Sequence, residues 1–221
     1  MPSNLKKETQ ATVKESSRVV GEVISSSITD FVTELWSKDK DGEELEILRP
    51  NFGSFLRVES VEEGITAYAV VYNIITGPYD AQHKPSALGL SRQELRMEQP
   101  HIFSLLQTQI HATIIGFKQD GQLHQYLPPK PPQVHDFVFV ADPDEVADLT
   151  ADQGFLRLLT NVQSVPIDEL LAASIRQAQA CHRDCKKDYH AFLVDAGKAL
   201  SHLIRDDYDR LVSLLKKIKP Y

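Results

Sequence analysis

Residues 126–145 read YLPPKPPQVHDFVFVADPDE, and this stretch decides the fold. Four of the five residues from 128 to 132 are proline. Proline has no backbone N–H and holds φ near about −65°, so these residues predict an extended strap that lies outside any strand ladder.

A strand and a capped helix are predicted directly after the strap. Residues 137–140, FVFV, are all apolar and favour β-structure. Asp142 can cap a helix, Pro143 suits its first position, and Glu145 has the spacing of a capping box. The order of strap, buried strand and capped helix is typical of the closing edge of a small β-barrel.

Further strands are predicted on both sides of a long insertion. Residues 19–36 alternate in part and indicate one long or broken strand, and residues 53–59 and 65–76 are rich in β-favouring types. Asp120-Gly121 is a strong hairpin signal between residues 110–117 and 122–127. Between these strands, a capping box from Ser91 to Glu94 predicts a helical insertion near residues 91–107.

These features together resemble the HAS-barrel, the N-terminal domain of HerA-like DNA-translocating ATPases. The strap, the strand with Val138 and the Asp-Glu pair opening a helix are similar to the end of that barrel. Residues 18–27 with Phe31-Val32 resemble its first strand, and residues 53–58 its second. The resemblance covers residues 18–150 and implies an α+β protein with a small antiparallel barrel.

The motor domain of those ATPases is missing. Its phosphate loop has the pattern G-x-x-x-x-G-K-[ST], in which backbone donors and a lysine hold phosphate. The only Gly-Lys pair here is Gly197-Lys198, followed by Ala199, and Phe192 stands where the first glycine belongs. The resemblance therefore implies a docking or assembly role without ATP hydrolysis, and no cofactor is expected.

Charge and composition predict a cytoplasmic protein that does not bind nucleic acid directly. No apolar run approaches the roughly 18 residues of a membrane span, and residues 1–17 form a polar tail that we expect to be flexible. The chain has a net charge of −7, with twenty-one Asp and Glu against ten Lys and Arg in residues 19–166. Such an acidic barrel repels phosphate.

A helical region is predicted for residues 151–221. Apolar residues recur at spacings of three and four from Ala178 to Leu203, which forms one narrow seam over about seven helical turns. Leu211 and Leu215 belong to a last amphipathic segment. The barrel, the other helices or a second subunit are the candidates to cover these apolar stripes.

Metal and catalytic sites are not expected. Cys181 and Cys185 lie on the apolar seam without a second cysteine pair, so we interpret them as buried free thiols rather than zinc ligands. His111, His124 and His135 lie on neighbouring predicted strands and the strap, where satisfied structural histidines are the favoured interpretation. No motif prepares a nucleophile or a general base.

The sequence therefore predicts a non-enzymatic interaction module that docks a protein partner or associates with itself. The candidate interaction residues are Trp36, Tyr126, Pro131, Pro132, Leu211 and Leu215. Trp36 is interpreted first as an anchor at the barrel rim and the prolines first as a structural strap. Two other functions stay open: an accessory factor in DNA processing, and a small-molecule-binding protein that uses the barrel mouth and residues 77–89.

Overall fold

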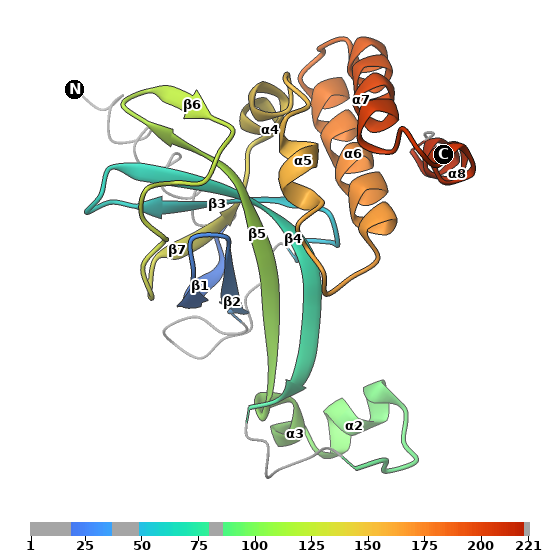
Figure 1. The fold of residues 1–221 in the computed structure, drawn as a ribbon. Coiled ribbons are helices and arrows are strands. Elements are labelled where there is room, and N and C mark those ends of the chain that lie inside the picture. The colour runs from blue at the N-terminus through green and yellow to red at the C-terminus, as the bar shows by residue number, and fades with distance from the viewer. Residues whose placement is uncertain (1–18, 37–48, 80–85, 219–221) are drawn as a thin grey trace, which may run out of the picture.

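The computed structural model describes residues 19–36, 49–79 and 86–218. Within these ranges, six strands close into an antiparallel β-barrel, and β6 extends the sheet beside β5 (Figure 1). The barrel order is β2-β1-β7-β3-β4-β5, and β2 pairs with β5 to complete the circle. The predicted α+β class with a small antiparallel barrel is confirmed. The strands are β1 Val19–Ser26, β2 Asp30–Leu35, β3 Phe55–Ser60, β4 Ile65–Pro78, β5 Leu106–Gln119, β6 Gln122–His124 and β7 Phe137–Val140.

The barrel interior is a packed apolar core. Inward and outward side chains alternate along each strand, so Leu56 and Val58 of β3 are fully buried inside while Arg57 lies on the outside. Phe31 is the largest of the interior side chains. The other members are Val20, Val23, Ala69, Val71, Ile110, Ala112, Ile114 and Val138.

The N-terminal segment forms two strands, so the broken form of the predicted strand is the one found. The chain turns at Ser27, whose Oγ accepts hydrogen bonds from the backbone N–H groups of Thr29 and Asp30, both at 3.1 Å. Close pairing of β1 with β2 requires Gly21, because a Cβ there would lie 1.8 Å from the backbone oxygen of Glu34.

The four prolines of the strap between β6 and β7 lie outside the sheet, as predicted. The end of the strap pairs with β1, because the His135 N–H donates to the Val23 carbonyl at 2.9 Å and the Val23 N–H donates to the Asp136 carbonyl at 3.0 Å. Asp136 at its end accepts hydrogen bonds from the Ser60 hydroxyl and from the Gln133 backbone N–H. Lys130 forms an ion pair with Glu63 at 2.6 Å. β7 then fills the gap between β1 and β3 and so closes the barrel.

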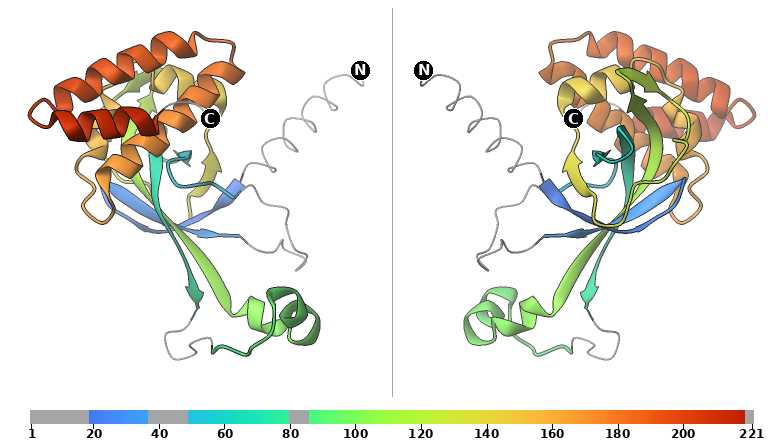
Figure 2. Two further views of the ribbon diagram at one scale, coloured as in Figure 1. Left: turned by 90° about the vertical axis from the view of Figure 1, so that its right-hand side faces the viewer. Right: turned by 90° about the vertical axis from the view of Figure 1, so that its left-hand side faces the viewer.

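Five helices follow β7 and cover one outer face of the barrel (Figures 1 and 2). The first begins with the predicted capping box of Asp142, Pro143 and Glu145. None of the described helices is long and apolar enough to cross a membrane. The five are α4 Pro143–Leu149, α5 Phe155–Leu159, α6 Ile167–Asp184, α7 Tyr189–Leu203 and α8 Tyr208–Lys217.

A second apolar core joins these helices to the barrel. Phe55, Tyr68 and Ile115 point outward from β3, β4 and β5 and belong to one apolar cluster with buried side chains of the helices. Phe155 of α5 is fully buried in this core, and its ring centroid lies 6.0 Å from that of Phe55. The apolar stripes of the helices are therefore covered within the chain, by the barrel and by one another.

The predicted seam from Ala178 to Leu203 is interrupted. α6 ends at Asp184, Lys186 adopts φ +56°, and Asp188 caps α7 by accepting from two backbone N–H groups. Cys181 and Cys185 form no disulfide, and they are half-buried rather than buried as predicted. Burial is the main cause that raises the pKa of each thiol to about 11, so both resist ionisation near neutral pH.

Candidate functional site

A two-stranded arm projects from the barrel on the side away from the helices α4 to α8 (Figures 1 and 2). Its ladder runs from Ile74 opposite Ile110 to Pro78 opposite Leu106. β3 pairs with β4 only as far as Val70, and β2 reaches β5 only as far as Gln109. The outer part of this hairpin therefore has no further strand beside it within the described chain. We define the arm as residues 72–79 and 86–108.

Two short helices form the tip of the arm. They are α2 Arg92–Glu98 and α3 His101–Ser104, within the predicted insertion. The predicted capping box is present, since Ser91 Oγ accepts from the Glu94 N–H and Glu94 accepts from the Ser91 N–H. Arg92 and Arg96 stack over the Phe103 ring at 5.0 and 5.5 Å. These contacts fold the tip on itself without burying any residue of either helix.

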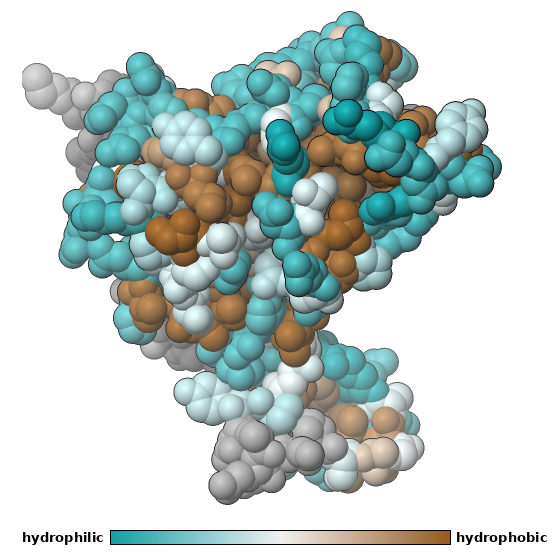
Figure 3. All heavy atoms as spheres, viewed as in Figure 1, coloured by the Kyte–Doolittle hydropathy of each residue, from teal (hydrophilic) through white to brown (hydrophobic). Residues whose placement is uncertain are grey.

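Large apolar side chains are exposed along the whole arm. Met97 is 80% exposed and Tyr79 is 73% exposed, and Figure 3 shows apolar side chains gathered at the arm tip. A two-stranded ribbon is at best marginally stable alone in water, and exposed apolar surface of this extent is typical of a binding site. The other exposed large apolar residues of the arm are Ile74, Ile75, Leu88, Leu90 and Leu105.

The β4 edge of the ribbon is poorly suited to pairing with another strand. Pro78 has no backbone N–H to offer. The N–H of Ile74 already donates to the Asn73 side-chain oxygen at 3.0 Å. Natural proteins protect exposed edges with such features. The arm therefore offers its side-chain faces, rather than the backbone of its β4 edge, for contact.

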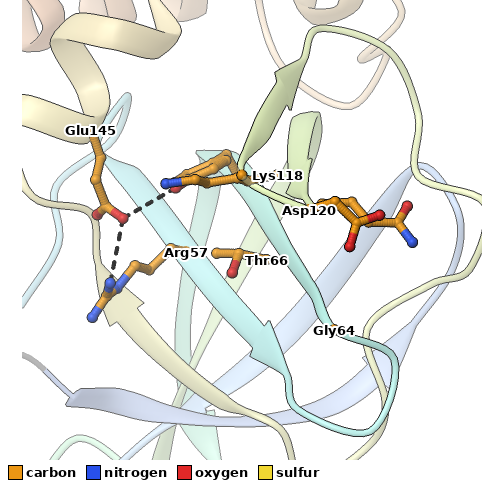
Figure 4. Close-up of a pocket in the computed structure, with 9 residues that line it drawn as sticks. Arg57, Gly64, Thr66, Lys118, Asp120 and Glu145 are labelled. Atoms are coloured by element: carbon orange, nitrogen blue, oxygen red, sulfur yellow. Dashed lines mark hydrogen bonds and ion pairs between the residues drawn. The ribbon is translucent and has the colours of Figure 1, made fainter.

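A polar pocket of about 300 Å³ lies on the outer wall of the barrel beneath α4 (Figure 4). Arg57 comes from β3, Tyr68 from β4, Lys118 from β5 and Glu145 from α4. Asp120 lies at the opposite end of the opening from Glu145 (Figure 4). Positive and negative side chains therefore share the pocket wall.

Glu145 is the centre of the contacts in this pocket. Its Oε1 accepts from Tyr68 Oη at 3.1 Å and pairs with Arg57 Nη1 at 3.3 Å, and its Oε2 accepts from the Asp142 N–H at 2.9 Å. Burial, and then the negative charge of Glu145, raise the pKa of Tyr68. Tyr68 therefore stays protonated and donates. We call this set of Arg57, Tyr68 and Glu145 the latch, because it joins α4 to the barrel wall.

The latch is expected to contribute modestly to stability. Tyr68→Phe removes one hydrogen bond to a charged acceptor, and we expect it to lower the free energy of unfolding by about 1–2 kcal/mol. Chemical denaturation measures this value. Thr66→Val, a change at a neighbouring lining residue with no role in the latch, serves as the control and is expected to cost less. Equal losses in the two variants would show that the latch adds nothing specific.

The structure places the six predicted interaction residues in four different environments. Trp36 packs edge-on against Phe137, with ring centroids 5.4 Å apart. Tyr126 is 57% exposed and rests on Phe117 and His124. In the strap, Pro131 is exposed and Pro132 is buried. Leu211 and Leu215 are half-buried against the helical core.

The three predicted histidines are not brought together. His111 lies against Tyr72, His124 against Phe117, and His135 pairs with Glu22 at 3.1 Å. Among the described residues, no three His, Cys, Asp or Glu side chains are placed to hold a metal ion. A fourth histidine, His182, is buried in the helical core, where it makes a hydrogen bond with Thr150 at 2.9 Å. This burial lowers the pKa of His182.

None of the six predicted interaction residues lies in the arm, although the arm overlaps residues 77–89, which were considered as part of a small-molecule site. The signal available in the sequence was a helical insertion between two β-rich stretches, with Met97, Leu88 and Leu90 outside any strong apolar periodicity. Comparison with protein-family models and with curated proteins finds no match to this chain. The site therefore rests on the geometry of the arm and of the pocket.

Proposed function

We propose that this chain is a non-enzymatic interaction or assembly module of HAS-barrel type, which docks to protein through its arm. One observation carries the proposal: a protruding ribbon with a helical tip exposes apolar side chains along its length and buries none from its helices. The closed antiparallel barrel and its covering helices form a rigid base for such an arm.

The position of the exposed residues supports docking by the arm rather than by the helices. The apolar stripes of α6, α7 and α8 are covered by the barrel and by each other. On the arm, Ile75 is 46% exposed on the ribbon and Met97 is 80% exposed at the tip. Burying apolar area contributes about 25 cal/mol per Å², so a protein that covers these side chains gains affinity from each of them.

The proposal is tested with two matched double variants used as bait in an extract of the source cells. The arm variant carries Ile75→Glu and Met97→Glu. The control variant carries Val61→Glu and Val194→Glu, which are also exposed but lie outside the arm, so both variants change the net charge equally. We expect proteins, including untagged copies of the chain, to be retained by the wild type and the control but lost from the arm variant.

Two outcomes would contradict the proposal. Identical retained proteins for all three baits would exclude the arm as the docking element. Hydrolysis of ATP by the pure protein, at a rate above that of a mock preparation, would exclude a non-enzymatic module.

A further inference from the structure

We infer that the arm docks against the arm of a second copy of this chain, so that two barrels are held apart by their paired arms. The inference rests on the proposed function and names the occupant of the arm. Three properties of the arm support it: its net charge, its size and the blocked backbone of its β4 edge.

The arm is electrically neutral on an acidic protein. Its described residues carry Arg92 and Arg96 against Glu94 and Glu98, and the ribbon itself has no charged side chain. The whole chain has a net charge of −7, so electrostatic repulsion opposes contact between two copies of it. Contact between two neutral arms avoids this repulsion, because the arms project beyond the barrels (Figure 2).

The arm also has the size that a stable dimer needs. A standard interface buries about 800 Å² on each partner and uses about 20–30 residues a side. Residues 72–79 and 86–108 comprise 31 described residues, including seven exposed large apolar side chains. An interface of standard size therefore requires that an identical arm covers most of these residues.

The β4 edge of the ribbon favours a closed pair over an open-ended assembly. Pairing by strand addition would leave a new edge open for the next copy, but on the β4 edge Pro78 and the Asn73 contact with the Ile74 N–H block this route. Contact through side-chain faces about a two-fold axis uses the same patch on both copies and leaves no free site for a third.

The test measures the solution mass of the full chain by sedimentation and light scattering over a range of concentrations. One chain has a mass of 24.9 kDa, and we expect the wild type and the control variant to reach twice this mass. The arm variant is expected to remain a single chain, with a dissociation constant raised at least about 100-fold, because each copy would bury two unpaired carboxylates. Circular dichroism checks that each variant is folded.

A second measurement does not depend on any variant. Hydrogen exchange of wild-type arm peptides, compared at concentrations below and above the dimer transition, is expected to slow in residues 72–79 and 86–108 and to stay unchanged on α7. Exchange that is independent of concentration in the arm would overturn the inference.

The outcomes separate this inference from the proposed function. A wild-type dimer that persists in the arm variant would place self-association elsewhere and overturn the inference, while interaction as a function would stand. A wild type that stays a single chain at every concentration would also overturn the inference. The bait experiment then decides whether the arm binds a different protein.

Discussion

Phe155→Ala is expected to lower the free energy of unfolding by about 3–5 kcal/mol, the range for removing a large aromatic side chain from a core. Phe155 is fully buried between α5 and the barrel wall, where its ring lies beside Phe55. The loss combines the transfer of apolar surface with the cavity left between two rigid layers. Chemical denaturation followed by far-ultraviolet circular dichroism measures it.

Tyr208→Ala is the control for this change. Tyr208 is an aromatic residue at the start of α8, and it is 75% exposed. We expect its removal to change the free energy of unfolding by no more than about 0.5 kcal/mol. A loss below about 1 kcal/mol for Phe155→Ala would mean that the helices are not packed on the barrel as described.

Gly53→Ala is expected to cost about 2–5 kcal/mol, because two penalties add at this position. Gly53 has φ +84°, which a residue with a Cβ adopts only with strain, and it precedes β3 where α6 crosses the barrel. A Cβ there would lie 2.7 Å from the backbone carbon and from the Cβ of Ala173. Thermal and chemical unfolding measure the combined loss.

Gly64→Ala separates the two penalties. Gly64 also has a positive φ, +64°, but a Cβ there would meet no atom within 4 Å. We expect it to show only the backbone strain, about 1–2 kcal/mol. The difference between the two variants then reports how tightly α6 is held against the barrel, and equal losses would argue against close contact at Ala173.

The parts of the fold that were predictable from the sequence are those fixed by local chemistry. The prolines from Pro128 to Pro132 exclude a ladder, and the Asp142 capping box begins α4 as predicted. Asp120 and Gly121 both adopt positive φ in the two-residue loop between β5 and β6, as their hairpin signal indicates. Each of these features depends on a few adjacent residues.

The parts that were not predictable depend on contacts between distant residues. The apolar spacing from Ala178 to Leu203 continues through the turn at Lys186, because both helices face the same core and no proline or glycine marks the break. The spacing therefore indicates which side of each helix faces the core, and Asp188 was the local sign that a new helix begins there.

The arm was not predictable from the sequence for a related reason. Residues 65–76 are one β-rich stretch, which predicts a strand but does not mark where that strand leaves the barrel. Ala67 to Val71 are buried, but Ile74 and Ile75 lie beyond the barrel and are exposed. β5 begins at Leu106, which was assigned to a helix. Only the lengths of β2 and β3, which end before the hairpin does, determine where the barrel stops and the arm starts.

The position of β7 determines when the barrel can form during synthesis. β7 pairs with β1, whose Val19 lies opposite Phe139, and with β3, where Leu56 lies opposite Val140. The edges of β1 and β3 therefore stay open on the ribosome until the strap and β7 have emerged. Closure through contacts so far apart in sequence is slow, and apolar side chains such as Phe31 remain accessible to chaperones and to other nascent chains in the meantime. The strap therefore connects β6 to β7 and also delays closure of the barrel until it has been synthesised.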